Sequence, residues 1–184
     1  MAETIPEVIV HPAPNDYLDV MTRAVFQAGL SWASIAKHWE QYREAFDGFD
    51  PAKVAAYTEG DVDRLMRAEG VLHSVRKIRA TIANAAAIIE VGALRQAQPP
   101  RQARDDEDGF RVYLRSFRDY AALTADFRKR FKFMGEMNVW YFLFRVHEPV
   151  PRFEHWVTTI PGDHPRMKEM VEKARAAGLS MELK

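Results

Sequence analysis

Apolar residues recur every three or four positions in several separate stretches of the chain, a period that is typical of helices with one buried face. The clearest stretches are residues 15–27, 31–46 and 74–90. Residues 137–146 are apolar almost all round, which predicts a central helix that is buried on every side. No useful length of chain alternates apolar and polar residues as a half-buried strand does. The pattern therefore predicts an all-α protein.

Capping residues mark where several of these helices begin. Asp50 followed by Pro51 is a cap with proline at the first helical position, and it opens a short helix. Thr58 and Asp61 have the spacing of a capping box, which opens another. A last amphipathic helix is expected from about Pro165 to Ala177.

Residues 91–109 interrupt the helical pattern. They contain Gly92, Pro99, Pro100 and an acidic run that ends at Asp108. We expect an exposed, mobile loop here, with helices resuming at about 110. A chain of 184 residues is long enough for one domain or for two closely packed lobes. We predict a single domain over residues 1–184 with this one loop.

Composition limits the chemistry more than it identifies it. The chain has no cysteine, which excludes disulfides, thiol nucleophiles and any zinc site with thiolate ligands. No stretch approaches the roughly 20 apolar residues of a membrane span, so no membrane association is expected. The N-terminal residues lack the basic and apolar regions of a secretory signal, and a cytoplasmic location is expected by default.

The formal net charge is zero, which argues against a strongly electrostatic nucleic-acid binder. The charges are unevenly distributed, however. Residues 40–63 are acidic on balance, whereas residues 64–79 and 111–132 are basic. One face can therefore attract phosphates while the whole chain stays neutral, although solvated helix faces are the commoner meaning of such runs.

Two strings of residues stand at a distinctive distance from each other, Gln27-Ala28-Gly29-Leu30-Ser31-Trp32 and Phe49-Asp50-Pro51-Ala52-Lys53-Val54. With them the chain resembles the DNA-3-methyladenine glycosylase I family, closely over residues 16–90 and more loosely over 125–146. The resemblance implies a helix–hairpin–helix DNA glycosylase-like fold, with a base pocket between two packed helical lobes. Further matching positions are Asp61 to Leu65, Gly70-Val71, Lys77-Ile78, Ile82 to Ala85 and Phe131 to Gly135.

The resemblance implies a base pocket formed by Ala24, Gln27, Trp32 and Tyr141. Trp32 matches the family's pocket tryptophan, whose ring can stack on a flipped-out purine. Leu30, in the preceding turn, is placed to wedge into the base stack during flipping. Both residues also have an ordinary interpretation, since a tryptophan at a helix start or an apolar loop residue can simply belong to the core.

The resemblance also implies a DNA-binding hairpin that contains Gly70, Val71, Arg76 and Lys77. A glycine there lets backbone N–H groups approach a phosphate closely, and the start of the following helix adds its dipole. Phosphate contacts of this kind position a protein on DNA without reading the sequence. The alternative is a glycine that merely ends one helix before the next begins.

The chain departs from the family at several pocket positions. Ala24 stands where the family has a glutamate, so no catalytic carboxylate can be named. Glu136 is a candidate replacement acid, although a carboxylate at a helix N-terminus is the simpler interpretation. The family's N-terminal aromatic segment is missing, and Tyr141 occupies a position usually held by a smaller residue. Without cysteines the family's zinc site is absent, and we predict no metal and no cofactor.

These observations predict an enzyme, a DNA N-glycosylase of the 3-methyladenine type that flips alkylated bases out of DNA and hydrolyses their glycosidic bond in base-excision repair. Its partner is double-stranded DNA with alkylated or damaged bases, and no obligate protein partner is expected. Two alternatives stay open. One keeps the fold without the chemistry, as a catalytically inactive binder of damaged DNA. The other is a helical protein that binds a different small ligand, which the neutral charge permits.

Overall fold

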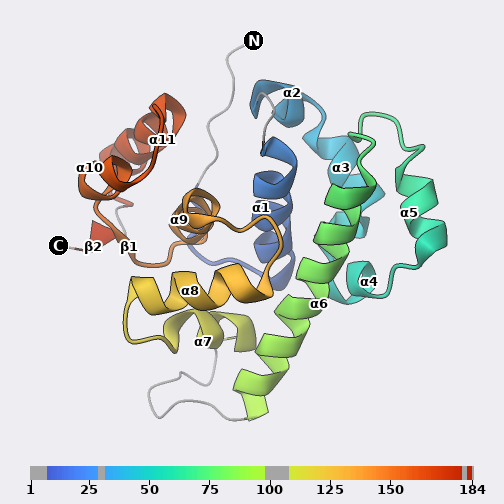
Figure 1. Cartoon of the computed structure of the whole chain (residues 1–184), viewed down its shortest axis with the longest axis horizontal. Coiled ribbons are helices and arrows are strands. Elements are labelled where there is room, and N and C mark those ends of the chain that lie inside the picture. The colour runs from blue at the N-terminus through green and yellow to red at the C-terminus, as the bar shows by residue number, and fades with distance from the viewer. Residues whose placement is uncertain (1–7, 29–31, 98–107, 180–181, 184) are drawn as a thin grey trace.

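The computed structural model describes residues 8–28, 32–97, 108–179 and 182–183, and within them the chain is helical apart from one pair of two-residue strands (Figure 1). The all-α prediction is confirmed. The strands pair in parallel, with Val150 opposite Glu182. None of the described helices has the length and apolar character needed to span a bilayer. The helices are α1 (Pro14–Gln27), α2 (Trp32–Lys37), α3 (Trp39–Ala45), η1 (Asp47–Phe49), α4 (Pro51–Ala55), α5 (Glu59–Leu65), α6 (Val75–Ala97), α7 (Gly109–Arg115), α8 (Tyr120–Arg130), α9 (Glu136–Arg145), α10 (Phe153–Trp156), η2 (Val157–Thr159) and α11 (Pro165–Ala176); the strands are β1 (Val150–Pro151) and β2 (Glu182–Leu183).

The predicted caps form as expected. The Asp50 carboxylate accepts hydrogen bonds from the backbone N–H groups of Ala52 and Lys53 at the start of α4. The backbone N–H of Thr58 donates to the Asp61 carboxylate, 2.9 Å away, and so completes one half of the capping box of α5. These local bonds satisfy N–H groups that a helix leaves unpaired in its first turn.

The helix expected over 31–46 is two helices instead. Helix α2 ends at Lys37, and α3 begins at Trp39 after a break at His38, whose backbone has φ −109° and ψ 12°. No glycine or proline marks this break, so the sequence pattern did not reveal it. The apolar period continues across the break, and Ile35, Trp39 and Tyr42 are all buried.

The predicted loop at 91–109 is wrong over its first seven residues, because α6 continues to Ala97 with Val91 buried. Residues 98–107 lie outside the described part of the chain. Gly92 lies within α6, where α7 crosses it closely. A Cβ added to Gly109 would lie 2.2 Å from the Gly92 carbonyl oxygen, so the missing side chain at Gly109 allows the backbones of α6 and α7 to touch.

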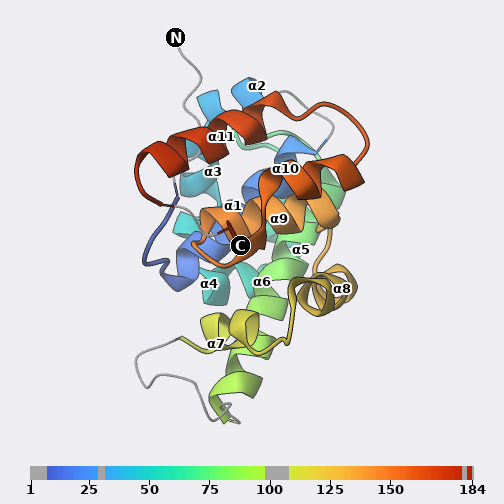
Figure 2. The ribbon, with the colours of Figure 1, turned by 90° about the vertical axis from the view of Figure 1, so that its left-hand side faces the viewer.

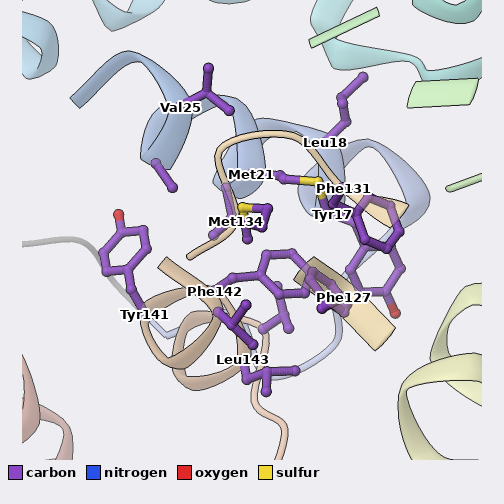
Figure 3. Packing of buried hydrophobic residues seen from close by; sticks show 14 of the residues in the cluster. Tyr17, Leu18, Met21, Val25, Phe127, Phe131, Met134, Tyr141, Phe142 and Leu143 are labelled. Atoms are coloured by element: carbon purple, nitrogen blue, oxygen red, sulfur yellow. The ribbon is translucent and has the colours of Figure 1, made fainter. Parts of the chain in front are cut away.

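The predicted central helix is α9, and it is surrounded by the rest of the molecule. Figure 3 shows Phe142 among Tyr17 and Met21 of α1 and Phe127 of α8. The ring centroids of Phe127 and Phe142 are 5.4 Å apart. The short helix α10, which the sequence pattern did not predict, covers another side of α9 (Figure 2). Buried aromatic contacts of this kind therefore fix the position of α9 between α1, α8 and α10.

Helix α1 lies between α9 and α6, so any pocket between the two groups of helices would lie beside α1. In Figure 1, α3, α4 and α5 lie on the α6 side of α1, whereas α8, α10 and α11 lie on the α9 side. Almost every side chain of α1 from Tyr17 onward is buried or nearly so. Polar groups on α1 are therefore enclosed between the two sides and need partners there.

Candidate functional site

Three polar side chains form a stripe along α1. Asp19, Arg23 and Gln27 are spaced by four residues and therefore share one face of the helix. Asp19 and Gln27 are both buried, each with 6% of its surface exposed. A polar stripe on a buried helix is unusual, since charged residues are almost never enclosed without partners.

Asp19 joins α1 to α3. Its carboxylate accepts a hydrogen bond from the Trp39 indole N–H at 3.1 Å and one from Arg43 at 2.7 Å. The Nε atom of Arg23 lies 3.7 Å from the same carboxylate, and the Arg23 guanidinium lies 4.4 Å from the centre of the Trp39 ring. One carboxylate thus serves two guanidinium groups and an indole.

Two polar atoms of the stripe are left over. Arg23 Nε and Gln27 Oε1 are buried and have no hydrogen-bond partner among the described residues. The first is a donor and the second an acceptor. Four residues apart on one helix face, they offer a complementary pair of contacts.

Helix α9 brings a second positive charge to this region. Arg145 is buried and donates to the Tyr141 hydroxyl at 3.3 Å, with its guanidinium 5.8 Å from the Tyr141 ring. Burial, followed by the charge of Arg145, lowers the pKa of Arg23. Burial also raises the pKa of Asp19, against the opposing effect of the neighbouring arginines. Charges from α1, α3 and α9 therefore act on one another here, with Asp19 and Arg145 buried and Arg43 half exposed.

The predicted pocket residues are placed as follows. Ala24, Gln27 and Tyr141 are all buried. Tyr141 lies at the rim of the aromatic cluster, with its hydroxyl directed away from Leu143 (Figure 3). Tyr141 acts electrostatically on the pKa of Arg23, against the larger effects of burial and of Arg145. Trp32 begins α2.

Two of the predicted positions cannot be compared with the structure. Leu30 and the side chain of Trp32 lie outside the described residues, and their wedge and stacking roles stay predictions. Glu136, the candidate replacement acid, is exposed in the first turn of α9. This position agrees with a carboxylate that the helix dipole favours.

Gly70 lies in the connection between α5 and α6 with φ +77°, a left-handed conformation that favours glycine. A Cβ there would lie 3.0 Å from the Gln41 side chain. The Val71 side chain is buried, so only its backbone is available to a phosphate. The backbone N–H of Leu72 is already used, since it donates to the Tyr42 hydroxyl at 2.8 Å.

A groove of about 680 Å³ runs beside Gly70, and its charge is mixed. The carboxylates of Glu44 and Glu69 lie in its wall together with Arg64 and His38. This groove alone is a poor attractant for phosphate.

Lys77 is engaged within the protein. Its ammonium donates to the carbonyl oxygens of Phe26 and Ala28, both at 2.9 Å, and so ties the start of α6 to the end of α1. A phosphate contact by Lys77 would have to use its third hydrogen. Arg76 is exposed, with its guanidinium 4.8 Å from the centre of the Phe133 ring.

The sequence patterns did not identify Asp19, Arg43 or Arg145 as site residues. Asp19, Arg23 and Gln27 follow one another at intervals of four residues, and this spacing was a usable signal for the stripe on α1. Arg145 gave another signal, since it is a charge within an otherwise apolar helix. Across the described ranges, no three His, Asp or Glu side chains gather as a possible metal site.

Known proteins resemble this chain both in sequence and in fold. Residues 13–146 match the family model described as methyladenine glycosylase. DNA-3-methyladenine glycosylase 1 of Escherichia coli (strain K12) is 48% identical over 65 residues, which are 35% of each chain. DNA-3-methyladenine glycosylase of Haemophilus influenzae is 44% identical over 63 residues, 34% of each chain. The matched region thus spans about a third of these curated relatives.

Solved structures agree over a longer part of the chain. A structure of 3-methyladenine DNA glycosylase I from Staphylococcus aureus has 26% identity and a TM-score of 0.57, covering 75% of this chain and 77% of that one. A second structure of a 3-methyladenine DNA glycosylase I has 29% identity and a TM-score of 0.53, covering 73% and 79%. The likeness therefore includes the arrangement of the helices as well as the short matching strings.

Proposed function

The chain belongs to the methyladenine glycosylase family, and from this we propose that it is a DNA N-glycosylase that removes alkylated bases in base-excision repair. The observation that carries the proposal is the family match over residues 13–146. That range includes the polar stripe of α1, the hairpin before α6 and the central helix α9. The substrate is double-stranded DNA with alkylated bases, and we expect a cytoplasmic location.

The reaction is hydrolysis of the bond between the sugar C1′ and the base nitrogen. The bonding electrons leave with the base, water adds to C1′, and the water proton passes to solvent or to the departing base. A base that carries a positive charge from alkylation departs neutral, so this step proceeds without an acid. The absence of a carboxylate at Ala24 fits such a substrate, because general acid catalysis is needed chiefly for neutral bases.

The remaining predicted residues hold the substrate. Trp32 stacks on the flipped base, and Leu30 fills the gap that the base leaves in the duplex. Backbone groups of Gly70 and Val71, together with Arg76, hold the phosphates on one strand. Enclosure by α1 and α9 removes water from the reacting bond, which strengthens every electrostatic contact there.

A base-release assay on DNA treated with a methylating agent tests the proposal. Purified protein is expected to release methylated base and leave abasic sites, and Trp32→Ala is expected to abolish release. Leu94→Ala, at an exposed position of α6, is the matched control and should be fully active. Tight binding to an abasic duplex without release would instead indicate an inactive binder of damaged DNA. Affinity that is independent of salt would indicate a ligand other than DNA.

Ala24→Glu restores the glutamate that the family has at this position, and so tests whether the rest of the pocket is intact. A carboxylate restored at this position would accept a hydrogen bond from the base and attract its positive charge, so it is expected to raise excision of 3-methyladenine by about 10-fold, the effect of one hydrogen bond to a charged group. Ala24→Gln, which adds similar volume without the charge, is the control. No increase in a folded Ala24→Glu protein would mean that other residues have remodelled the pocket.

A further inference from the structure

Lys77 extends from the first turn of α6 to the end of α1. Its ammonium donates to the carbonyl oxygens of Phe26 and Ala28, both at 2.9 Å. A helix leaves its last carbonyl groups without partners in its own backbone, and a cation is favoured beside them. Lys77 therefore caps the C-terminus of α1 from a different helix.

These two hydrogen bonds limit what else the Lys77 ammonium can bind. It has three hydrogens, and two of them are already donated. The side chain is partly buried, burial lowers its pKa, and Nζ lies 5.9 Å from the centre of the Phe26 ring. Arg76, the preceding residue, is exposed. Two neighbouring cations thus have different surroundings, and only Arg76 is open to solvent.

A second link between α1 and the hairpin before α6 passes through Tyr42 of α3. The Tyr42 hydroxyl accepts a hydrogen bond from the backbone N–H of Leu72 in the hairpin, at 2.8 Å. The Tyr42 ring meets the Phe26 ring edge to face, with the ring centroids 4.9 Å apart. Phe26 is fully buried, so it cannot shift without disturbing its neighbours. The end of α1 and the hairpin are therefore joined at Phe26, through its carbonyl oxygen and through its ring.

We propose that Lys77 is a positioning residue that fixes the end of α1 relative to the hairpin, so that a phosphate held by the hairpin brings its nucleotide to the pocket. The inference rests on the proposed function and gives Lys77 a role other than the phosphate contact that the resemblance implies. Ala24 and Gln27, two of the predicted pocket residues, lie in the last turn of α1, which Lys77 caps. A shift of about 1 Å in such groups can slow a reaction about 10²-fold.

The salt dependence of DNA binding separates a positioning lysine from one that contacts a phosphate. Each phosphate contact contributes about 0.9 to the slope of log affinity against log salt concentration. On an undamaged duplex, Arg76→Met is expected to reduce the slope by about this amount, whereas Lys77→Met is expected to keep the wild-type slope. An equal reduction in both variants would show that Lys77 contacts a phosphate and would overturn the inference.

The rate of base release measures the positioning itself. With protein in saturating excess over methylated DNA, Lys77→Met is expected to release base about 10²-fold more slowly in a single turnover. Weaker binding cannot cause this loss, because all of the DNA is already bound. Lys168→Met, at an exposed position of α11, is the matched control and should keep the wild-type rate.

Lys77→Arg provides a second variant in case Lys77→Met does not fold. A guanidinium also donates several hydrogen bonds but from a longer, planar group, so the variant is expected to keep the salt slope and to release base at an intermediate rate. A wild-type rate in every folded Lys77 variant would overturn the inference.

A fluorescent duplex tests the same inference without base release. 2-Aminopurine in a mismatch becomes brighter when it leaves the base stack, and a mismatched base is easier to flip. Saturating wild-type protein is expected to raise the fluorescence, and Lys77→Met to raise it much less. An equal rise in both would overturn the inference while leaving the glycosylase proposal intact. The expected difference in a protein that releases no base would overturn the hydrolysis alone, and duplex affinity that is independent of salt would overturn both.

Discussion

Two buried carboxylates in this protein each lie between two arginines, and they are used differently. Glu148, just after α9, is bonded by Arg111 Nε at 3.0 Å and by Arg115 Nε at 2.9 Å. Asp19 on α1 is bonded by Arg43 at 2.7 Å, while Arg23 lies 3.7 Å away. Each carboxylate has two arginines beside it, but only Glu148 accepts a hydrogen bond from both, while Asp19 accepts one from Arg43 and one from the Trp39 indole.

This difference indicates two uses of buried charge. The Glu148 cluster stabilises the structure, whereas the Asp19 cluster has a donor that is available to a ligand. The Glu148 cluster joins α7 to the end of α9, and Glu148 is the one carboxylate that bonds both of its arginines. The Asp19 cluster keeps an unpaired donor next to the predicted base pocket. Substitutions in the two clusters should therefore affect different properties.

The largest expected effect is on folding, at Glu148. Glu148→Gln removes the carboxylate charge that Arg111 and Arg115 both bond, and we expect the free energy of unfolding to fall by about 3–5 kcal/mol. Chemical denaturation measures the loss. Glu59→Gln breaks the exposed pair with Arg79 and should change stability by less than about 1 kcal/mol. If Glu148→Gln lowers the free energy of unfolding only slightly, the Glu148 cluster is not needed for stability and the comparison fails.

Helix α7 carries both arginines of the Glu148 cluster, so its contact with α6 comes next. Gly109→Ala places a methyl group 2.2 Å from the Gly92 carbonyl oxygen, and displacement of α7 should cost about 1–3 kcal/mol. Gly92→Ala is the paired control. Its Cβ would lie 3.4 Å from the nearest atom, Phe110 N, and alanine is favoured in a helix, so thermal unfolding should show little or no loss.

Arg23→Met tests whether the Asp19 cluster contributes to the stability of the fold. Methionine fills a similar volume without an unpaired donor, and Asp19 keeps its bond to Arg43, so the free energy of unfolding should stay within about 1 kcal/mol of the wild type or rise. Denaturation in urea is the measurement. A loss as large as that of Glu148→Gln would mean that both clusters are structural, and the comparison would fail.

The smallest effect concerns Glu154, a half-exposed carboxylate that Arg175 bonds together with Glu182, whose side chain is buried. The hydrogen bond from Arg175 is the main cause that lowers the pKa of Glu154 from 4.5 to about 2. A lowered carboxylate pKa stabilises the fold above pH 4.5, and the contribution is lost as the pH falls toward 2. Since Glu154 is half exposed, the contribution should not exceed about 1 kcal/mol.

Unfolding midpoints measured from pH 6 to pH 2 check the contribution of Glu154. Glu154→Gln should lower stability at pH 6 and converge with the wild type near pH 2. Glu169→Gln, in an exposed pair with Lys173, is the control. A difference that is constant with pH would show that the ion pair with Arg175 contributes nothing.

Much of the fold could be predicted from the sequence, because its signals are local. Asp50 and Thr58 start their helices through bonds within three residues, and the apolar run of α9 needs burial wherever it lies. The continuation of α6 could not be predicted in this way. Gly92 resembles a helix breaker until Gly109 is found packed against it from a distant part of the chain.

The candidate site was less accessible to prediction, because it depends on contacts among three helices. Nothing in the sequence pairs Asp19 with Arg43, or brings Arg145 near Arg23. The family resemblance drew attention to position 24, where a carboxylate is missing. Arg23 and Gln27, two of the residues with a buried atom that has no partner among the described residues, lie one residue before and three after it.

Helix α6 runs without interruption for 23 residues, or about 34 Å, from the hairpin to its contact with α7. Bending it would break main-chain hydrogen bonds, and its first turn is tied to α1 through Lys77. A protein with such a rigid helix at its centre does not need to change conformation when it binds a ligand. Under the proposed function, most of the rearrangement should therefore occur in the DNA duplex, where the damaged nucleotide rotates about its sugar–phosphate backbone toward a rigid protein.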